Sequence, residues 1–313
     1  MKNIIQICGN LKLCNNLPIV AALGVFDGVH HGHRQIIRQA AYRAKECGGK
    51  VLALSFSPHP RAMLKNAEPP TLLLSEKQRE KMLISAGADA VGFINFTYEV
   101  AALTPERFLQ ELRDLPMLDI CGICVGSRWR FGCGGSGGRA ELDKFCRENN
   151  WSFDPVPEVE NNGVTISSSL IRQAISAGKL DYAASMLGSA VQLSGIVEHG
   201  FHIASEKLSA PTANLRVTAG VMVPDGVYSG SAEVDGRSYA AALNIGVAPT
   251  FGNGLRRVEI HLIGFDGSLY GRELTVKLHR FLRNERRFSS SDELKQQIAC
   301  DIQAIMQDHD LQK

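Results

Sequence analysis

The sequence predicts an α/β protein of two domains. The N-terminal domain is expected to be built on a parallel sheet, and the C-terminal domain to be a small antiparallel β-barrel with a terminal helix. A length of 313 residues suits two domains better than one. In the first half, short apolar runs alternate with helical patterns, as in sheets covered by helices. After residue 187 short strands and glycine turns take over, so we expect domains over 1–186 and 187–313.

The first domain is expected to begin with a strand, a helix and a second strand. Residues 19–26 form an apolar run, 33–47 carry apolar side chains at helical spacing before two glycines, and 51–56 form another apolar run. Short connections around a crossover helix make the two strands parallel. The further expected elements are a helix over 76–86, a strand over 91–96, a helix over 105–114, a strand over 119–125, and helices over 139–149 and 173–187.

The second domain is expected to be antiparallel. Two pairs of apolar runs, each separated by a segment with an Asp-Gly step, predict two hairpins. The pairs are 226–234 with 237–245 and 258–265 with 273–282, and a final helix follows over 291–309. Glu259 and His261 alternate with apolar residues, so their strand should bury one face. Together these elements predict a barrel closed by one helix.

Composition and charge exclude several classes of protein. A net charge of +2 offers no basic field for nucleic acid. No apolar run approaches about 18 residues, so no membrane span is expected, and the N-terminus lacks the pattern of a signal peptide. Eight scattered cysteines indicate reduced, cytoplasmic usage rather than a disulfide framework. The oligomeric state stays open, a homo-oligomer included.

Two further patterns have structural interpretations. Cys121 and Cys124 form a Cys-x-x-Cys inside an expected strand, where residues three apart face opposite sides. No second such pair completes a zinc site, so buried strand cysteines are favoured over a metal site. Five of the seven residues from Gly132 to Gly138 are glycine, and a flexible connector is favoured over a phosphate-binding loop.

The chemically unusual residues of the first half follow the predicted strands. They are Asp27 to His33 after the first strand, Ser57 to Pro60 after the second, Asn95 to Thr97 at the end of the third, and Gly126 to Gly132 after the fourth. In open α/β sheets, ligands bind outside the carboxyl ends of the strands. Several loops that converge on one edge therefore predict a binding site there.

The segment from Gly24 to His33 is the centre of that expected site. His30 and His33 are three residues apart and can share one face of a first helical turn. The glycines around them let the backbone approach a ligand closely. A helix N-terminus favours anions, because its first N–H groups are unpaired and the helix dipole is positive there. The segment predicts chemistry on a nucleoside triphosphate.

A second candidate phosphate site lies between Ile166 and Arg172. Serines are good N-caps, and the spacing of Ser168 and Arg172 puts a guanidinium in the first turn of a helix. Taken alone, the pattern fits simple capping with a surface arginine equally well. Together with the histidine pair, a second phosphate clamp becomes the better interpretation.

These motifs resemble, in order and over nearly the whole chain, the family of bifunctional riboflavin kinase / FMN adenylyltransferases (prokaryotic FAD synthetases). The matching segments are Gly24 to His33 (the HxGH-bearing motif), Phe56 to Pro60, Arg130 to Gly132, Ile166 to Arg172, Pro211 to Leu215, Gly226 to Tyr228, Asn244 to Gly246, Pro249 to Gly252 and Glu259 to Leu262. The resemblance implies a Rossmann-like nucleotidyltransferase domain and a flavokinase-like barrel. It also implies ATP and Mg²⁺, with riboflavin, FMN and FAD as substrates and products.

For adenylyl transfer, the resemblance implies that the FMN phosphate attacks the α-phosphorus of ATP and pyrophosphate leaves. His30 and His33 would donate to the triphosphate, while Ser168 and Arg172 would hold the departing phosphates. The remaining nucleotide-binding candidates in this half are Gly24, Phe26, Asp27, Gly28, Gly32 and Ser167. The flavin-binding candidates are Pro58, His59, Asn95, Arg130 and Phe131. Because both reactants are anions, positioning and charge neutralisation carry such a reaction.

For the kinase step, the resemblance implies that the riboflavin 5′-hydroxyl attacks the γ-phosphorus of ATP. Glu259 is the candidate base; without the family match, a solvent-facing strand carboxylate would be the better interpretation. Thr212 and Asn214 offer oxygen ligands for nucleotide and Mg²⁺.

The sequence departs from the family pattern in two places. The stretch from Gly200 to Ala210 lacks most of the glycines expected before the Pro-Thr-Ala-Asn motif, and Arg128 stands where aspartate is usual. Two alternatives therefore stay beside the bifunctional enzyme. One is an FMN adenylyltransferase with an impaired kinase domain, and the other is a non-catalytic regulator that binds flavin or nucleotide.

Overall fold

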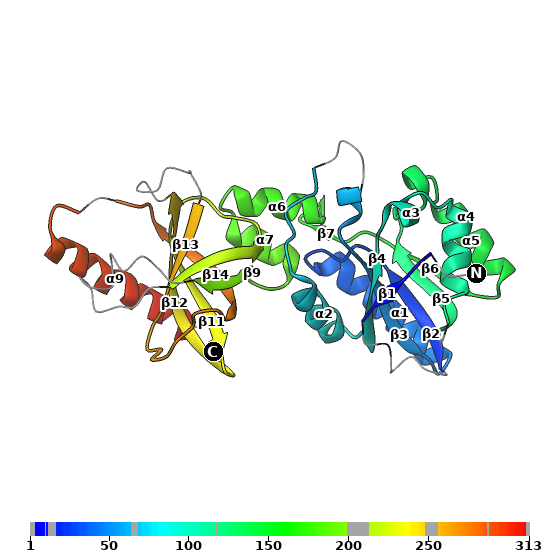
Figure 1. Cartoon of the computed structure of the whole chain (residues 1–313), viewed down its shortest axis with the longest axis horizontal. Coiled ribbons are helices and arrows are strands. Elements are labelled where there is room, and N and C mark those ends of the chain that lie inside the picture. The colour runs from blue at the N-terminus through cyan, green and yellow to red at the C-terminus, as the bar shows by residue number, and fades with distance from the viewer. Residues whose placement is uncertain are drawn as a thin grey trace. The chain divides into compact units, whose positions relative to one another are not determined.

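The computed structural model describes residues 4–9, 11, 17–63, 68–116, 118–198, 213–247, 256–286 and 288–310 (Figure 1). The chain divides into two compact units. The first consists of Met1–Pro70 and Glu76–Ser167, and the second of Thr71–Ser75 and Ser168–Lys313. The short segment Thr71–Ser75 thus joins the second unit although both of its flanks belong to the first.

A six-stranded sheet forms the centre of the first unit. Its order is β1-β4-β3-β2-β5-β6; β1 is antiparallel to β4, and all other neighbours are parallel. The strands are β1 (Ile7–Cys8), β2 (Pro18–Leu23), β3 (Lys50–Ser57), β4 (Ala90–Asn95), β5 (Asp119–Gly126) and β6 (Ser152–Val156). The chain moves outward from β2 to β4 and then continues on the other side of β2. The topological switch point, where ligands bind in such sheets, lies between β2 and β5.

Helices surround this sheet, and the alternation expected from the sequence is confirmed. They are α1 (His31–Glu46), η2 (Pro60–Met63), α2 (Glu76–Ser85), α3 (Tyr98–Ala101), α4 (Pro105–Arg113), η3 (Cys133–Gly135) and α5 (Arg139–Glu148). The expected ends of the longer elements are off by at most three residues. The small edge strand β1, the strand β6 and the two-residue strands β7 (Glu160–Asn161) and β8 (Val164–Thr165) were not expected. Two-residue strands leave no periodicity that a sequence pattern could reveal.

The single helix expected over 173–187 is two helices. They are α6 (Ser168–Ser176) and α7 (Leu180–Leu187), both in the second unit. Gly178 lies between them with φ = 72°, a conformation that a side chain disfavours and that ends α6. The expectation of one helix was wrong because both segments carry apolar residues at helical spacing, and only Gly178 marks the break.

The second unit contains a closed antiparallel barrel, as expected. Its strand order is β10-β13-β12-β11-β14-β9. The strands are β9 (Val191–Glu198), β10 (Ala213–Ala219), β11 (Gly226–Val234), β12 (Arg237–Val247), β13 (Arg256–Leu262) and β14 (Glu273–Arg283), and the chain ends in α9 (Ser291–Asp310). Helix α9 packs on β11 and β12 (Figure 1). Strand β13 and the first half of β14 bury alternate residues, which fill the interior, whereas β11 is buried along most of its length.

One of the two expected hairpins is confirmed. Strands β11 and β12 pair around Asp235 and Gly236, whose φ angles of 51° and 77° are those of a tight two-residue turn. The other hairpin was wrong, because β13 pairs with β10 and β12 while β14 pairs with β11 and β9. The loop between β13 and β14 is long enough to cross the barrel, and closure of the barrel decides the pairing.

Two other expectations are changed by packing. Strand β5 is irregular against β2 at Cys121, so side chains do not alternate regularly between the two sheet faces from Cys121 to Cys124. The Sγ atom of Cys121 lies 3.6 Å from that of Cys47. The glycine-rich turn is compact rather than a flexible connector. A Cβ at Gly132 or Gly137 would lie 2.8 Å from atoms of Pro105. Close approach to Pro105 therefore requires glycine at these two positions.

Candidate functional site

The segment Gly24–His33, called the histidine segment below, follows β2 at the switch point of the sheet. Phe26 and Val29 have φ angles of 52° and 42°, in the left-handed region. A β-branched residue such as Val29 is strained there. Strained residues persist only where their surroundings fix them, and they concentrate at functional sites. The backbone of the histidine segment is therefore held in place by its surroundings.

The candidate nucleotide-binding residues of the histidine segment lie close to one another. Phe26 and Asp27 are at most 1% exposed. A Cβ at Gly24 would lie 2.9 Å from the ring of Phe26, and a Cβ at Gly32 would lie 3.2 Å from the ring of His30. Gly28 has φ = 88°. The three glycines thus make room for the turn and for the two rings.

The two histidines form one stacked pair. His30 is the N-cap of α1, and its Nδ1 accepts a hydrogen bond from the His33 backbone N–H at 3.4 Å. Their ring centroids are 3.6 Å apart with planes inclined by 20°, and Phe26 meets the His33 ring edge-on at 5.3 Å. Because Nδ1 of His30 is an acceptor, the proton of the neutral ring sits on Nε2, which becomes a donor. The sequence prediction that the two histidines share a face is confirmed.

The histidine pair is electrically neutral near pH 7. Burial, with a smaller effect of His31, lowers the pKa of His30 to about 4. Burial also lowers the pKa of His33 well below its usual value, and the charges of His30 and Arg79 act in the same direction. Nδ1 of His33 is buried and has no hydrogen-bond partner among the residues that the structure describes. The pair can offer neutral N–H donors to an anion, together with the first N–H groups of α1.

The flavin-binding candidates after β3 and β4 lie at one sheet edge. Ser57 at the end of β3 is in register with the exposed Asn95 at the end of β4. Pro58 follows Ser57 through a cis peptide bond, and the half-buried His59 accepts a hydrogen bond at Nδ1 from the Arg61 backbone N–H at 3.1 Å. The convergence of these loops at the carboxyl edge follows from the parallel register of β3 and β4.

The two candidates after β5 have structural contacts of their own. Arg130 donates from Nε to the Gly135 carbonyl at 2.9 Å and from Nη2 to the Ser136 carbonyl at 3.3 Å, which closes the glycine-rich turn. Phe131 is 6% exposed and stacks on Trp129 with centroids 4.9 Å apart. Packing accounts for both side chains as placed, and their contact with flavin stays a prediction.

The predicted second phosphate motif starts α6 in the second unit. Ser167 and Ser168 are half-buried, and Ser168 is the first residue of α6. Arg172 donates from Nε to the Thr71 carbonyl at 2.7 Å. This bond ties α6 to the segment Thr71–Ser75. Cooperation of Ser168 and Arg172 with the histidines stays a prediction.

In the barrel, the predicted base and metal ligand are neighbours. Asn214 on β10 is in register with Glu259 on β13, and Glu259 is in register with Asn244 on β12. Directly paired residues of antiparallel strands point to the same face. All three are half-buried, and Oδ1 of Asn244 is buried without a hydrogen-bond partner among the described residues. The barrel thus presents a row of polar groups with one unsatisfied acceptor.

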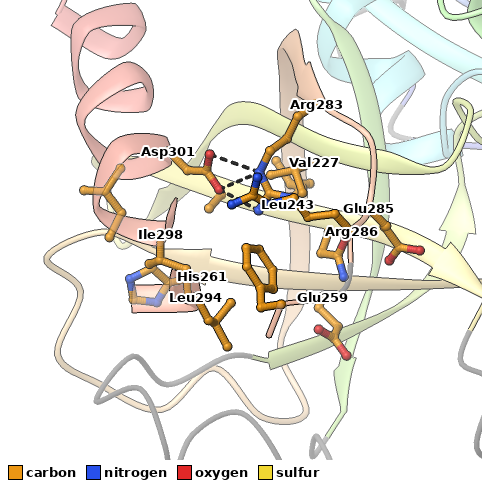
Figure 2. A pocket seen from close by; sticks show the side chains of 14 residues that line it. Val227, Leu243, Glu259, His261, Arg283, Glu285, Arg286, Leu294, Ile298 and Asp301 are labelled. Carbon is orange, nitrogen blue, oxygen red and sulfur yellow. Dashed lines mark hydrogen bonds and ion pairs between the residues drawn. The ribbon is translucent and has the colours of Figure 1, made fainter. Parts of the chain in front are cut away.

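A cavity of about 300 Å³ opens beside this row, a volume suited to a small organic ligand. Figure 2 shows side chains of the barrel and of α9 converging on it. Polar groups come from Glu259, His261 and Asn244, and apolar ones from Leu294 and Ile298 of α9. The expectation that this strand buries one face is confirmed, since its apolar residues are buried while Glu259 and His261 are half-buried.

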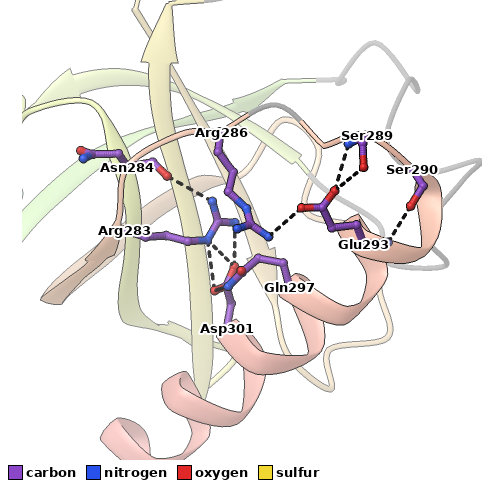
Figure 3. A network of polar contacts seen from close by, with 8 residues as sticks. All are labelled: Arg283, Asn284, Arg286, Ser289, Ser290, Glu293, Gln297 and Asp301. Carbon is purple, nitrogen blue, oxygen red and sulfur yellow. Dashed lines mark hydrogen bonds and ion pairs between the residues drawn. The ribbon is translucent and has the colours of Figure 1, made fainter.

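An ion-pair network fixes α9 over the cavity (Figure 3). Arg283 at the end of β14 donates from Nη2 to Asp301 at 2.7 Å, and Asp301 is only 9% exposed. Gln297 donates to the same carboxylate at 2.8 Å, and Arg286 pairs with Glu293 at 3.4 Å. A buried, charge-assisted pair of this kind orients a helix more firmly than an exposed one.

Several predicted features fall outside the described residues. Thr212, the altered stretch from Gly200 to Ala210, and the motif from Pro249 to Gly252 are among them. Within the described part of the chain, no group of three or more His, Cys, Asp or Glu side chains could hold a metal ion. Asn214, in register with Glu198 and Glu259, still offers the oxygen donors that Mg²⁺ prefers.

Two residues at these sites were not singled out from the sequence. Asn244 belongs to a matching motif but received no role, and its buried, unsatisfied oxygen appears only in the fold. Arg79 lies on α2, is 2% exposed and lies behind the histidine segment. No spacing or composition signal identifies such a residue, because its burial depends on how α2 packs.

The chain matches two family models in sequence. The model described as FAD synthetase matches residues 14–170, and the model described as riboflavin kinase matches residues 187–308. The bifunctional riboflavin kinase/FMN adenylyltransferase of Pseudomonas fluorescens is 34% identical over 286 residues, which cover 91% of each chain. The protein of the same description from Escherichia coli K12 is 33% identical over 295 residues, or 93% of each chain.

A solved structure is similar over most of the chain. It is a crystal structure described as a macrolide-efflux protein from Streptococcus pneumoniae, with a TM-score of 0.78 and 26% identity. The similarity covers 95% of this chain and 97% of that one. Among the described residues of the present chain, no helix has the length and apolar character needed to cross a membrane.

Proposed function

The chain belongs to the family of bifunctional riboflavin kinases/FMN adenylyltransferases, and from this premise we propose which of its residues serve each reaction. It has riboflavin kinase and FMN adenylyltransferase activities and makes FAD from riboflavin by way of FMN. ATP, riboflavin and FMN are its substrates. The adenylyltransferase reaction is assigned to the histidine segment, and the kinase reaction to the barrel cavity. The proposed functional domains are 1–186 and 187–313.

The stacked, neutral histidine pair carries the adenylyltransferase assignment. In that reaction a phosphate oxygen of FMN bonds to the α-phosphorus of ATP, and the bond from this phosphorus to the pyrophosphate oxygen breaks. The Nε2–H of His30 and the ring of His33 donate to the oxygens that gain charge. The helix N-terminus of α1 adds further N–H groups. Ser168 and Arg172 hold the departing pyrophosphate. No covalent intermediate with the protein is needed, since positioning and charge stabilisation suffice.

The polar row beside the barrel cavity carries the kinase assignment. Glu259 accepts the proton of the riboflavin 5′-hydroxyl while the hydroxyl oxygen bonds to the γ-phosphorus of ATP. The bond from this phosphorus to the bridging oxygen breaks, and ADP leaves. Support comes from the half-buried position of Glu259 on the wall of a cavity of about 300 Å³. Asn244 orients the bound flavin through its unsatisfied Oδ1.

Mg²⁺ is proposed as the metal of the kinase site, with Asn214 and Thr212 as protein ligands. Mg²⁺ keeps several waters and takes most other ligands from substrate phosphates. A site with few protein donors therefore fits the register of Asn214 beside Glu259. When bound, the ion would neutralise charge on the phosphates of ATP.

We place the protein in the cytoplasm, where free thiols persist. The described cysteines are unpaired, including Cys47 and Cys121 with sulfurs 3.6 Å apart. Its partners are small molecules rather than nucleic acid, in keeping with the net charge of +2.

One assay tests both assignments. Purified protein is incubated with ATP and Mg²⁺ and either riboflavin or FMN, and the flavins are separated by chromatography. We expect FMN and FAD from riboflavin, and FAD from FMN. FAD from FMN without FMN from riboflavin would overturn the kinase assignment. Failure to form either product would instead support a binding protein.

A further inference from the structure

Arg79 has no role in the functions assigned above, yet it is the largest fully buried side chain of the described residues. It lies on α2 and is 2% exposed. Its guanidinium is 5.0 Å from the centroid of the Phe93 ring. Burial of a charged arginine is costly unless its surroundings bind it. The contacts of Arg79 therefore show which segments its burial holds together.

The guanidinium joins the histidine segment, which follows β2, to the neighbouring strand β3. Nη1 of Arg79 donates to the Val25 carbonyl at 2.9 Å and to Ser55 Oγ at 3.1 Å, and it lies 3.4 Å from the Phe56 carbonyl. Ser55 is fully buried, and its Oγ donates to the same Val25 carbonyl at 2.7 Å. Arg79, Ser55 and Val25 thus form a closed triangle that ties the histidine segment to β3.

This triangle lies directly beside the strained part of the histidine segment. The Val25 carbonyl belongs to the peptide that leads into Phe26, whose φ angle of 52° is strained. Three residues later, Val29 is strained as well, and its carbonyl accepts from Arg34 Nε at 3.0 Å. Strained residues of this kind persist only where their neighbours are fixed. Arg79 provides the fixed neighbour at the first of them, and the edge of Phe26 in turn supports the His33 ring.

We propose that Arg79 is the positioning residue of FMN adenylylation, which holds the Val25–Phe26 peptide so that His30 and His33 stack where they meet the triphosphate. This inference rests on the proposed role of the two histidines. Arg79 itself touches neither substrate, because it is sealed behind the histidine segment. All of its polar contacts given above come from Nη1, while Nε is buried without a hydrogen-bond partner among the described residues, so lysine with its single nitrogen should replace it in part.

The test compares Arg79→Met, Arg79→Lys and Ser55→Ala with the unaltered full-length enzyme. Methionine fills a similar volume without the charge, and because removal of one buried charge can destabilise a fold, the folded fraction of each variant is measured as well. We expect Arg79→Met to raise the KM for ATP and lower kcat of FAD formation, each about 10-fold, in line with the ~100-fold cost of a displacement of about 1 Å. Arg79→Lys and Ser55→Ala should change the KM for ATP and the kcat of FAD formation by smaller factors. The matched control Lys81→Met removes an exposed charge from the same helix and should change nothing.

Two internal measurements separate positioning from folding. Both tryptophans, Trp129 and Trp151, belong to the first unit, so their fluorescence reports its folded fraction alone. A merely structural role would lower kcat by the unfolded fraction and leave the KM for ATP unchanged; that result would overturn the proposal. FMN formation from riboflavin should be unaffected in the same preparations. Equal FAD formation by Arg79→Met and unaltered enzyme overturns this inference alone, whereas no FAD from the unaltered enzyme overturns the adenylyltransferase assignment itself.

Discussion

The histidine segment gathers its functional groups from ten consecutive residues, whereas the barrel cavity draws on several strands and on α9. The first site lies on one strand end and one helix start, so a single segment brings His30 and His33 together, and Arg79 of α2 holds the peptide that precedes them. The second depends on register, because Asn214, Glu259 and Asn244 meet only through the pairing of three strands. The comparison separates a site whose main groups are neighbours in the chain from a site whose groups are brought together only by strand pairing.

The two sites also differ in charge. The histidine pair is neutral, because burial lowers both pKa values. The barrel cavity is lined by charged groups, among them Glu259, Arg283 and Asp301. The first site is thus suited to holding an anion by oriented N–H donors, and the second to moving a proton. Variants that separate the two reactions test this difference.

The largest effect is expected at the barrel. Glu259→Gln removes the proposed base and should lower the kcat of FMN formation by about 10²- to 10⁴-fold, the usual contribution of general base catalysis. FAD formation from FMN should stay unchanged, as followed by chromatography of the flavins. Glu233→Gln alters an exposed carboxylate of β11 and serves as the matched control. Undiminished FMN formation by Glu259→Gln would remove Glu259 as the base.

The reciprocal change is His30→Ala. It removes one donor of the stacked pair and the cap of α1, and FAD formation should fall about 100- to 1,000-fold, as for other preorganised donors. FMN formation in the same sample should persist. Equal loss of both activities would contradict two separate sites, and the comparison drawn above would fail.

A smaller effect is expected where α9 meets the barrel. Arg283→Met leaves the Asp301 carboxylate buried without its cation, which loosens α9 over the cavity. The KM for riboflavin should rise about 10-fold, in keeping with a loss of about 1.4 kcal/mol in binding, while FAD formation from FMN is unaffected. The control Arg272→Met breaks the exposed pair with Asp235 and should change neither activity. An unaltered KM for riboflavin in Arg283→Met would show that the network does not shape the cavity.

The smallest effect on either activity is expected from pH, which should act on stability instead. The pKa of His30 is about 4 in the folded protein and near 6.5 when unfolded. Between these values the unfolded chain binds a proton that the folded one does not, so the first unit should lose stability as pH falls from 6.5 to 4, by about 3 kcal/mol from His30 alone, and His33 acts in the same direction. Urea unfolding followed by tryptophan fluorescence measures this loss.

The variant His30→Gln should flatten the pH dependence of unfolding. The rate of FAD formation should show no imidazole ionisation between pH 5.5 and 8, since the ring stays neutral there. A clear ionisation of His30 near pH 6.5, in the rate or by NMR titration, would contradict the neutral pair.

Much of the fold, and the place of the histidine segment after β2, followed from the sequence. The βαβ pattern, the barrel and the hairpin at Asp235 and Gly236 were predicted, because these features depend on periodicity and turn chemistry over a few residues. The second hairpin was predicted wrongly, since β13 and β14 are adjacent in the chain but not in the barrel. The break at Gly178 was missed for a related reason: one glycine decided between one helix and two.

By itself, the sequence determined the alternation of elements, the place of the histidine segment after β2 and the family that the motifs resemble. Only the tertiary structure decided that Arg79 lies beneath that segment, that Phe131 stacks on Trp129 in the core, and that Asn244 faces a cavity. The physical reason is the separation along the chain over which each effect acts. Hydrophobic period and turn propensity act between near neighbours in the chain, whereas burial of a charge and closure of a barrel depend on segments that only folding brings together.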